Sequence, residues 1–311
     1  MLQQTQVATA TPFYQSFLDR FPTLATLASA RASDVLAAWA GLGYYRRARH
    51  LHQAARRVVR DHAGHVPDDV ARFGALPGVG RYTTGAVLSI CFDRPLAVLD
   101  GNVARVLSRL DALPISVKNA QGARKLWALV DSLVPMRGPG DWNQALMELG
   151  ATVCLPRTPR CEACPIRRRC RAHALGRVGD FPPAPPRRAS ERLRRAVVVI
   201  ERGGRILMVR REGELLGGLW EPPGVELQDG ENGAGTRAAL ARALRTLGVR
   251  ARLEPTGRTV RHAITHRAIE VEVWRGTPTV PVPRTARLRY LDPAASEVAI
   301  TALGKKVCRP V

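Results

Sequence analysis

The sequence predicts a protein of two domains, all-α in its first part and α+β in its second. Its 311 residues suffice for two domains of ordinary size, and 45% of them are apolar, enough for a core in each. Helical periodicity runs through residues 1–178, whereas apolar and polar residues alternate in stretches after residue 195. Residues 179–195 between them are rich in Pro and Arg and predict a stiff linker, because proline fixes φ and cannot donate a hydrogen bond.

Apolar periodicity and capping signals predict six helices in the first domain. Ser33 is the expected cap of the first helix, and Gly64 is expected to stop the second, which is basic and amphipathic. The predicted ranges are 34–39, 44–62, 82–92, 103–110, 120–134 and 142–154. No long alternating stretch interrupts them, which favours an all-α domain.

The periodicity of apolar residues changes in the second domain, residues 196–311. Residues 196–200 and 206–210 flank the turn Arg202-Gly-Gly-Arg205 and predict a β-hairpin. Residues 234–247 predict a helix closed by Gly248, and the alternating residues 268–274 predict a strand. The second domain is therefore expected to be α+β.

Basic residues outnumber acidic ones, with 48 Lys+Arg against 26 Asp+Glu and a formal net charge of +22. Such an excess favours a polyanionic partner, nucleic acid above all, although general use of Arg for solubility is an alternative. No apolar run approaches the ~18 residues of a membrane span, and we see no secretory leader. We therefore expect a cytoplasmic, nucleoid-associated protein with no membrane partner.

Four of the six cysteines form a short cluster with the spacing C-x6-C-x2-C-x5-C: Cys154, Cys161, Cys164 and Cys170. Disulfides are disfavoured in a cytosolic helical chain, so four close thiols favour a metal site. Zinc modules usually pair two C-x2-C knuckles, and only one is present. The uneven spacing therefore favours a [4Fe–4S] cluster over zinc.

A glycine-rich turn, Leu76-Pro-Gly-Val-Gly-Arg-Tyr-Thr-Thr-Gly85, precedes a predicted helix. Gly78 and Gly80 allow backbone amides at the helix start to bind a phosphate, although an ordinary helix connector is the alternative. Asp100 follows Tyr82 by eighteen residues and stands before a new helix. It is either a simple N-cap or a partly buried carboxylate that faces the ligand of the turn.

These features together resemble the endonuclease III-like helix-hairpin-helix superfamily of DNA glycosylases. Three strings resemble MutY-type adenine DNA glycosylases in particular: Met1-Leu-Gln-Gln-Thr-Gln-Val7, Gly41-Leu-Gly-Tyr-Tyr45 and Asn143-Gln-Ala-Leu-Met-Glu-Leu-Gly150. The family removes adenine mispaired with 8-oxoguanine or guanine from double-stranded DNA. The resemblance implies a monomeric base excision repair enzyme with a [4Fe–4S] cluster.

The resemblance also assigns catalytic roles. Asp100 matches the aspartate that stabilises the cationic sugar of the transition state, and Asn102 is expected to orient it. Tyr82 stands where bifunctional relatives have a lysine that forms a Schiff base, so the resemblance implies a monofunctional enzyme. An endonuclease III-type glycosylase/lyase is the alternative, and Tyr82 counts against it.

Five further residues match family contacts with DNA. Glu148 matches a residue that hydrogen-bonds the extruded adenine, and Leu2 and Thr5 match contacts with the pocket or the partner base. Gln4 and Tyr44 match residues that wedge the duplex beside the oxidised guanine. Tyrosine packed in a core is the alternative for Tyr44.

The family's general acid is a glutamate two residues before the position of Met1, and this sequence does not contain it. We expect the natural acid to lie upstream, and we expect the 311-residue chain itself to cleave slowly. A non-catalytic mismatch-binding paralogue is the alternative.

In the second domain, Leu216-Gly-Gly-Leu-Trp-Glu-Pro-Pro-Gly224 resembles a Nudix-type fold. Arg245 and Thr246 stand where Nudix hydrolases have paired acids that hold Mg²⁺, so we expect no diphosphate hydrolysis. MutY-type proteins use such a domain to recognise 8-oxoguanine. The string His262-Ala-Ile-Thr-His266 resembles the family loop that inspects this base, with Thr265 and His266 as the candidate contacts. Ile264 and Thr265 depart from the aromatic residue and the serine that usually precede the histidine, although Thr265 keeps a hydroxyl, and an ordinary strand and loop is the alternative.

Overall fold

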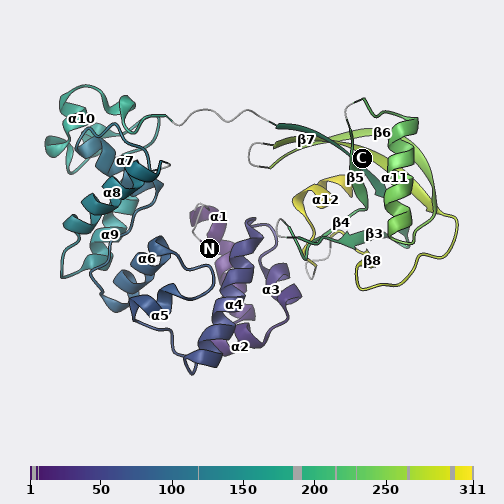
Figure 1. Ribbon diagram of the computed structural model, residues 1–311, viewed down its shortest axis with the longest axis horizontal. Helices are drawn as coiled ribbons and strands as arrows, with labels where there is room; N and C mark the ends of the chain where they lie inside the picture. Colours follow the sequence, from purple (N-terminus) through teal and green to yellow (C-terminus); the bar gives the residue numbers. More distant parts are fainter. Residues whose placement is uncertain are drawn as a thin grey trace. The chain divides into compact units, whose positions relative to one another are not determined.

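The computed structural model describes residues 1, 5, 7–117, 119–184, 191–213, 216–228, 230–264, 267–294 and 298–309 (Figure 1). The chain splits into two compact units. One unit joins Met1–Val59 to Arg188–Val311, and the other comprises Arg60–Arg187. The division of the sequence at residues 179–195 stays a prediction about domain organisation.

The unit of residues 60–187 is helical. Its α-helices are α5 (Val70–Gly74), α6 (Arg81–Phe92), α7 (Gly101–Leu110), α8 (Ala120–Leu133), α9 (Pro139–Glu148) and α10 (Arg171–Ala174). Apolar residues of α7 and α8 form its core together with the segment that precedes α7, and side chains of α9 pack against them. The helices predicted at 82–92, 103–110 and 120–134 are confirmed to within two residues. The one predicted at 142–154 is wrong at its end, because a π-helical turn, η1 (Leu149–Val153), follows α9.

The other unit takes three whole helices from the start of the chain, α1 (Val7–Arg20), α2 (Leu24–Ser29) and α3 (Ala32–Ala38), and all but the last two residues of α4 (Tyr45–Asp61). The prediction that Ser33 caps α3 is wrong. Arg31 is the N-cap, and its guanidinium contacts the carboxylate of Asp34 in the first turn at 3.0 Å. This ion pair accompanies a start of the helix two residues before the predicted one.

The remainder of this unit contains two sheets. The first has the order β5-β1-β7-β6, with β1 parallel to β7 and the other pairs antiparallel. The second has the order β2-β3-β4, and β8 pairs with β3. The strands are β1 (Glu191–Val199), β2 (Glu201–Arg202), β3 (Arg205–Arg210), β4 (Trp220–Glu221), β5 (Gly224–Glu226), β6 (Ala251–Ile264), β7 (Arg267–Pro278) and β8 (Leu288–Leu291).

The predicted hairpin is correct only around its turn. Strand β3 pairs with the two residues of β2, whereas residues 196–199 belong to β1 in the other sheet. The chain changes sheets at Ile200, which is fully buried. The predicted helix 234–247 and strand 268–274 are confirmed as α11 (Ala234–Thr246) and β7.

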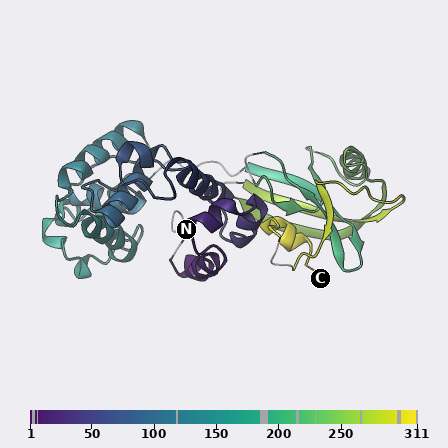
Figure 2. The ribbon, with the colours of Figure 1, turned by 90° about the horizontal axis from the view of Figure 1, so that it is seen from below.

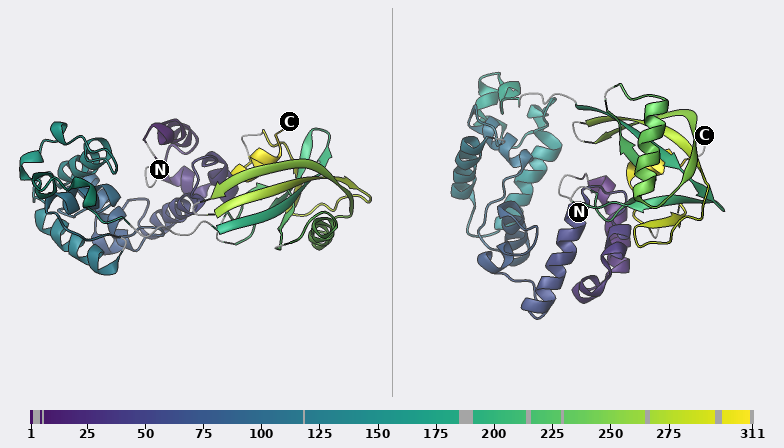
Figure 3. Two further views of the ribbon diagram at one scale, coloured as in Figure 1. Left: turned by 90° about the horizontal axis from the view of Figure 1, so that it is seen from above. Right: turned by 45° about the vertical axis from the view of Figure 1, so that its right-hand side comes forward.

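Helix α11 and helix α12 (Ala302–Val307) cover opposite faces of the first sheet (Figures 2 and 3). Alternation along β1 explains this arrangement. Ala196 and Val198 pack with α11, while Val197 packs with Leu303 and Val307 of α12.

Helix α11 contains no Asp or Glu. Within the described part of the chain, we find no helix of sufficient length and apolarity to span a membrane.

Candidate active site

The carboxylate of Asp100 is held from two sides. The buried segment 97–99 precedes it, and Asp100 is the N-cap of α7. Its Oδ1 accepts a hydrogen bond from the backbone N–H of Val103 at 2.7 Å, and its Oδ2 accepts one from Nδ2 of Asn102 at 3.1 Å. Asp100 is therefore both an N-cap and an oriented, half-buried carboxylate, and the helix terminus favours its negative charge.

Asn102 is itself oriented by Arg105, which the sequence analysis did not identify. The Arg105 guanidinium donates through Nη2 to Oδ1 of Asn102 at 2.9 Å, so that the Asn102 amide directs its NH₂ group to Asp100. Arg105 also donates to the backbone oxygens of Gly150 and Cys154, both at 2.7 Å. The spacing of three residues from Asn102 on one helix is the only local signal for this contact.

Gly150 lets η1 pack directly against the start of α7. A Cβ atom at this position would lie 2.6 Å from Cβ of Asn102 and 3.0 Å from its Cα. Only glycine fits such a close approach. The position of Asn102 therefore depends on a residue 48 positions later in the chain.

Tyr82 lies on α6 and is half-buried. Its hydroxyl donates to the sulfur of Met147 at 3.7 Å. Burial raises the pKa of the Tyr82 phenol, and the charge of Asp100 raises it further. Tyr82 is therefore a neutral phenol in the electrostatic field of the Asp100 carboxylate, and it carries no amine that can form a Schiff base.

Asn143 holds the segment that leads to Asp100, a role that the sequence analysis missed. Its side chain is fully buried in α9. Its Nδ2 donates to Oγ of Ser89 at 2.9 Å and to the backbone oxygen of Leu96 at 2.8 Å. Its Oδ1 accepts from the N–H of Val98 at 3.2 Å. One amide thus joins α6, α9 and the extended residues before α7.

The glycine turn precedes α6 as predicted. Gly78 adopts a φ of 76°, which favours glycine, and Gly80 is the extended N-cap of α6 without a side-chain cap. Both glycines are exposed. This geometry leaves the first amides of α6 uncapped by a side chain and suits them to an anion.

Glu148 is the last residue of α9, and its side chain is exposed. Its backbone oxygen accepts from Oγ1 of Thr152 at 2.8 Å within η1. The structure thus places Glu148 next to the turn that carries Gly150.

Tyr44 and Thr5 lie together in the other unit through Arg47. The guanidinium of Arg47 lies 5.1 Å from the ring centre of Tyr44 and donates through Nη2 to Oγ1 of Thr5 at 3.0 Å. Tyr44 is 53% exposed and has a φ of 48°, so it is a projecting residue rather than a core tyrosine. Leu2, Gln4, Thr265 and His266 lie outside the described residues.

The four clustered cysteines line one pocket. Burial raises the pKa of the Cys161 thiol, and the nearby thiols of Cys154, Cys164 and Cys170 raise it further. Arg109 is only 2% exposed and is enclosed by this loop. Its guanidinium donates to Sγ of Cys154 and to the backbone oxygens of Leu155, Pro156, Val178 and Phe181.

Comparison with known proteins places this geometry in a family. The sequence profile of the HhH-GPD superfamily of base excision DNA repair proteins matches residues 1–131, and that of the NUDIX domain matches residues 195–308. The chain is 42% identical over 273 residues to the adenine DNA glycosylase of Rattus norvegicus, across 73% of this chain and 53% of the relative. It is 37% identical over 363 residues to that of Homo sapiens, across 99% of this chain and 66% of the relative. The chain belongs to the adenine DNA glycosylase family.

A solved structure of a thermostable thymine-DNA glycosylase is also similar. It is 29% identical, with a TM-score of 0.51, across 56% of this chain and 80% of that one. The chain spans about half the length of the first curated adenine DNA glycosylases that it matches. Within the segment that matches the HhH-GPD superfamily lie Tyr82, Asp100 and Asn102, whereas Glu148 and the four cysteines follow it.

Proposed function

We propose that this protein excises adenine opposite 8-oxoguanine or guanine by monofunctional hydrolysis of the N-glycosidic bond. The observation that carries the proposal is the oriented carboxylate of Asp100 in the neighbourhood of Tyr82. An oxocarbenium-like transition state needs a fixed anion near the sugar, and a lyase would need an amine. This site offers the first through Asp100 and has a phenol where the second would stand.

The reaction breaks the bond between C1′ of deoxyribose and N9 of the extruded adenine. The bonding electrons leave with the base, and positive charge develops on the sugar, which Asp100 stabilises. Val103 N–H and Asn102 hold the carboxylate in place, so little reorganisation is needed as the charge appears. The base departs protonated, and water forms the new bond to C1′ and releases its own proton to the solvent, which leaves a hydroxyl on the sugar.

Protonation of the leaving base requires a general acid, which the family places before the position of Met1. Glu148 and Glu162 are the only glutamates before residue 179. Glu162 pairs with Arg167 in the cysteine loop. We therefore assign Glu148 to adenine binding and assign the general acid to neither glutamate.

Recognition of the partner base is assigned to the other unit. The exposed Tyr44, with Gln4, is proposed to enter the duplex beside the oxidised guanine, and Thr5 and Leu2 to contact the bases. Thr265 and His266 of the Nudix-like domain are proposed to contact 8-oxoguanine. The exposed Gly78 and Gly80 turn is proposed to bind a DNA phosphate.

The four cysteines are proposed to hold a [4Fe–4S] cluster. In the described part of the chain, no three His, Cys, Asp or Glu side chains approach closely enough to hold a single ion. Four thiols that line one pocket, brought together by a loop with a single C-x2-C pair, suit a polynuclear group. Arg109 would donate to the Cys154 sulfur, and a bound cluster would supply four iron–thiolate bonds that stiffen the arginine-rich loop. The iron and sulfide content of the purified protein tests this assignment.

An A:8-oxoguanine duplex tests the proposed activity. The protein is compared with an extended polypeptide in which a family segment with the glutamate precedes Met1. We expect base loss by the extended polypeptide, strand cleavage only after alkali, and loss of activity in Asp100→Asn. Direct nicking without alkali would favour a glycosylase/lyase instead. Binding without base loss by both polypeptides would indicate a mismatch-binding protein.

A further inference from the structure

Four residues of the Nudix-like domain pack into the helical segment at the beginning of the chain. We name residues 216–219 the anchor. Leu219 is fully buried and belongs to a cluster that includes Leu36 and Trp39, and Leu216 packs against the same cluster. These helical residues precede the anchor by about 180 positions. The apolar cluster therefore joins two parts of the chain that the sequence separates.

The anchor also makes a polar contact with α4. Nη1 of Arg49 donates to the backbone oxygen of Gly217 at 2.6 Å. A charged donor on a backbone oxygen is a directional contact, and it fixes the anchor relative to the axis of α4. Apolar packing alone would allow the two surfaces to slide.

The backbone of the anchor is strained in a way that only its surroundings explain. Leu216 has a φ of 58°, which is unfavourable for a leucine, and Gly218 has a φ of 84°. A Cβ on Gly218 would lie 3.1 Å from Cδ1 of Leu36. The anchor thus accepts unfavourable dihedrals where it contacts α3.

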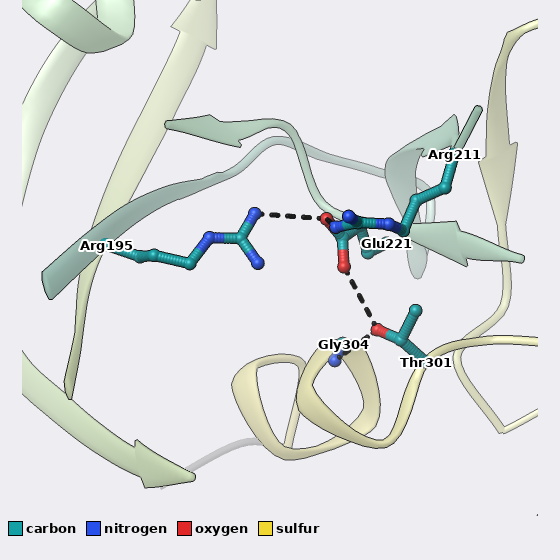
Figure 4. Close-up of polar contacts among 5 residues, drawn as sticks. All are labelled: Arg195, Arg211, Glu221, Thr301 and Gly304. Carbon is teal, nitrogen blue, oxygen red and sulfur yellow. Dashed lines mark hydrogen bonds and ion pairs between the residues drawn. The ribbon is translucent and has the colours of Figure 1, made fainter. Parts of the chain in front are cut away.

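The buried carboxylate of Glu221, two residues after the anchor, binds two arginines (Figure 4). The carboxylate of Glu221, 8% exposed, contacts Arg211 at 2.6 Å and Arg195 of β1 at 3.1 Å. Its other oxygen accepts from Oγ1 of Thr301, the N-cap of α12, at 3.3 Å. The backbone N–H of Arg211 donates to the oxygen of Leu219 at 2.8 Å. These contacts join β1, β4 and the start of α12 to the residues that flank the anchor.

The helical residues that contact the anchor also hold the loop that carries Tyr44. Trp39 packs with the anchor, and its Nε1 donates to the backbone oxygen of Gly43 at 3.1 Å. The hydroxyl of Tyr45, which begins α4, accepts from the N–H of Gly41 at 3.3 Å. The loop that carries Tyr44 is thus fastened to the same residues that receive the anchor.

We propose that the anchor sets the position of the Nudix-like domain relative to Tyr44, and that Arg49 and Gly218 thereby determine the preference for 8-oxoguanine without contacting DNA. This inference rests on the proposed function, because it assigns base recognition to both parts. Arg49 and Gly218 are positioning residues. Their substitution is expected to change discrimination between partner bases rather than general affinity for mismatched DNA.

Two substitutions test the proposal, each with a matched control. Arg49→Gln removes the bond to Gly217, and Arg56→Gln removes an exposed arginine from the same helix. Gly218→Ala adds a methyl group against Leu36. Gly213→Ala adds one at a similar φ of 87°, where no atom lies within 4 Å. Hydrogen exchange of α3 in the free protein and equilibrium affinities for A:8-oxoguanine and A:G duplexes are measured for all four variants.

We expect faster exchange in α3 for Arg49→Gln and Gly218→Ala than for their controls. We expect these two variants to lose about ten-fold in the ratio of affinities for the two duplexes, with the affinity for A:G within about two-fold of the parent. Unchanged hydrogen exchange in α3 would refute the claim that the anchor stabilises this helix. Faster exchange with an unchanged ratio would refute its role in recognition. An equal loss for both duplexes in Arg49→Gln and Arg56→Gln would make Arg49 an ordinary phosphate contact. Failure of the proposed function would appear differently, as a parent protein without preference between the duplexes.

Discussion

Replacement of Gly150 by alanine tests how the candidate site is held. The new Cβ would lie 2.6 Å from Cβ of Asn102, whereas carbon atoms in ordinary contact are ~3.5–4.0 Å apart. Asn102 must therefore move by ~1 Å or the η1 turn must give way. The hydrogen bond from Asn102 to Asp100 is 3.1 Å long, and a shift of this size takes it beyond the ~3.5 Å limit.

The consequences for Gly150→Ala differ in size for stability and for activity. Overpacking of this kind costs ~1–3 kcal/mol in the free energy of unfolding. A misplacement of ~1 Å at a catalytic group costs ~10²-fold in rate. Gly101→Ala is the matched control, because it adds the same methyl group beside Asn102 where no atom lies within 4 Å. Urea unfolding and single-turnover excision by the extended polypeptide measure both effects. A Gly150→Ala variant as stable and as fast as Gly101→Ala would refute the reasoning.

Three further predictions follow from single side chains. Asn143→Ala removes three hydrogen bonds, those with Ser89, Leu96 and Val98, and should lower the free energy of unfolding by about 3 kcal/mol, measured with urea; a loss below ~1 kcal/mol would contradict it. Burial and the charge of Asp100 raise the pKa of Tyr82, so above pH ~10 this phenol ionises in the unfolded chain before it ionises in the folded one, and the free energy of unfolding falls as pH rises. Tyr82→Phe should make this fall less steep when unfolding is measured against pH. An unchanged slope would disprove the shift. Burial raises the pKa of Cys308 to about 12, so native protein treated with iodoacetamide at pH 8 should be alkylated at the exposed Cys91 and not at Cys308, as peptide mass spectrometry will show.

Helix caps and apolar periodicity, which depend on neighbouring residues, predicted part of the site from the sequence. Asp100 was identified because a polar residue before a new helix is visible in the sequence, whether its role is capping or catalysis. Helices α7 and α8 were found because each has a clear apolar face, and α6 because it follows the glycine turn. Helix α1 was missed, and Pro12 stands within it. The predicted cap at Ser33 was wrong because the helix begins at Ala32, so that Ser33 lies inside its first turn.

The supporting residues could not be predicted, because their partners are far away in the sequence. Arg105 and Gly150 are 45 positions apart, and so are Val98 and Asn143. No periodicity or spacing relates such residues, and the closeness of Gly150 to Asn102 becomes visible only when α7 and η1 are packed. The anchor is a further example, since its partners in α3 and α4 lie in the other predicted domain.

The residues assigned to the two tasks of the proposed function fall into different compact units. Tyr44 and Thr5 lie with the Nudix-like domain, whereas Tyr82 and Asp100 lie in residues 60–187. Each unit has apolar clusters of its own, so loosening one core affects the groups of that unit first. Substitutions far apart without shared partners have nearly additive effects. Discrimination between partner bases and cleavage of the glycosidic bond are therefore expected to respond to separate sets of substitutions, although both act on one substrate.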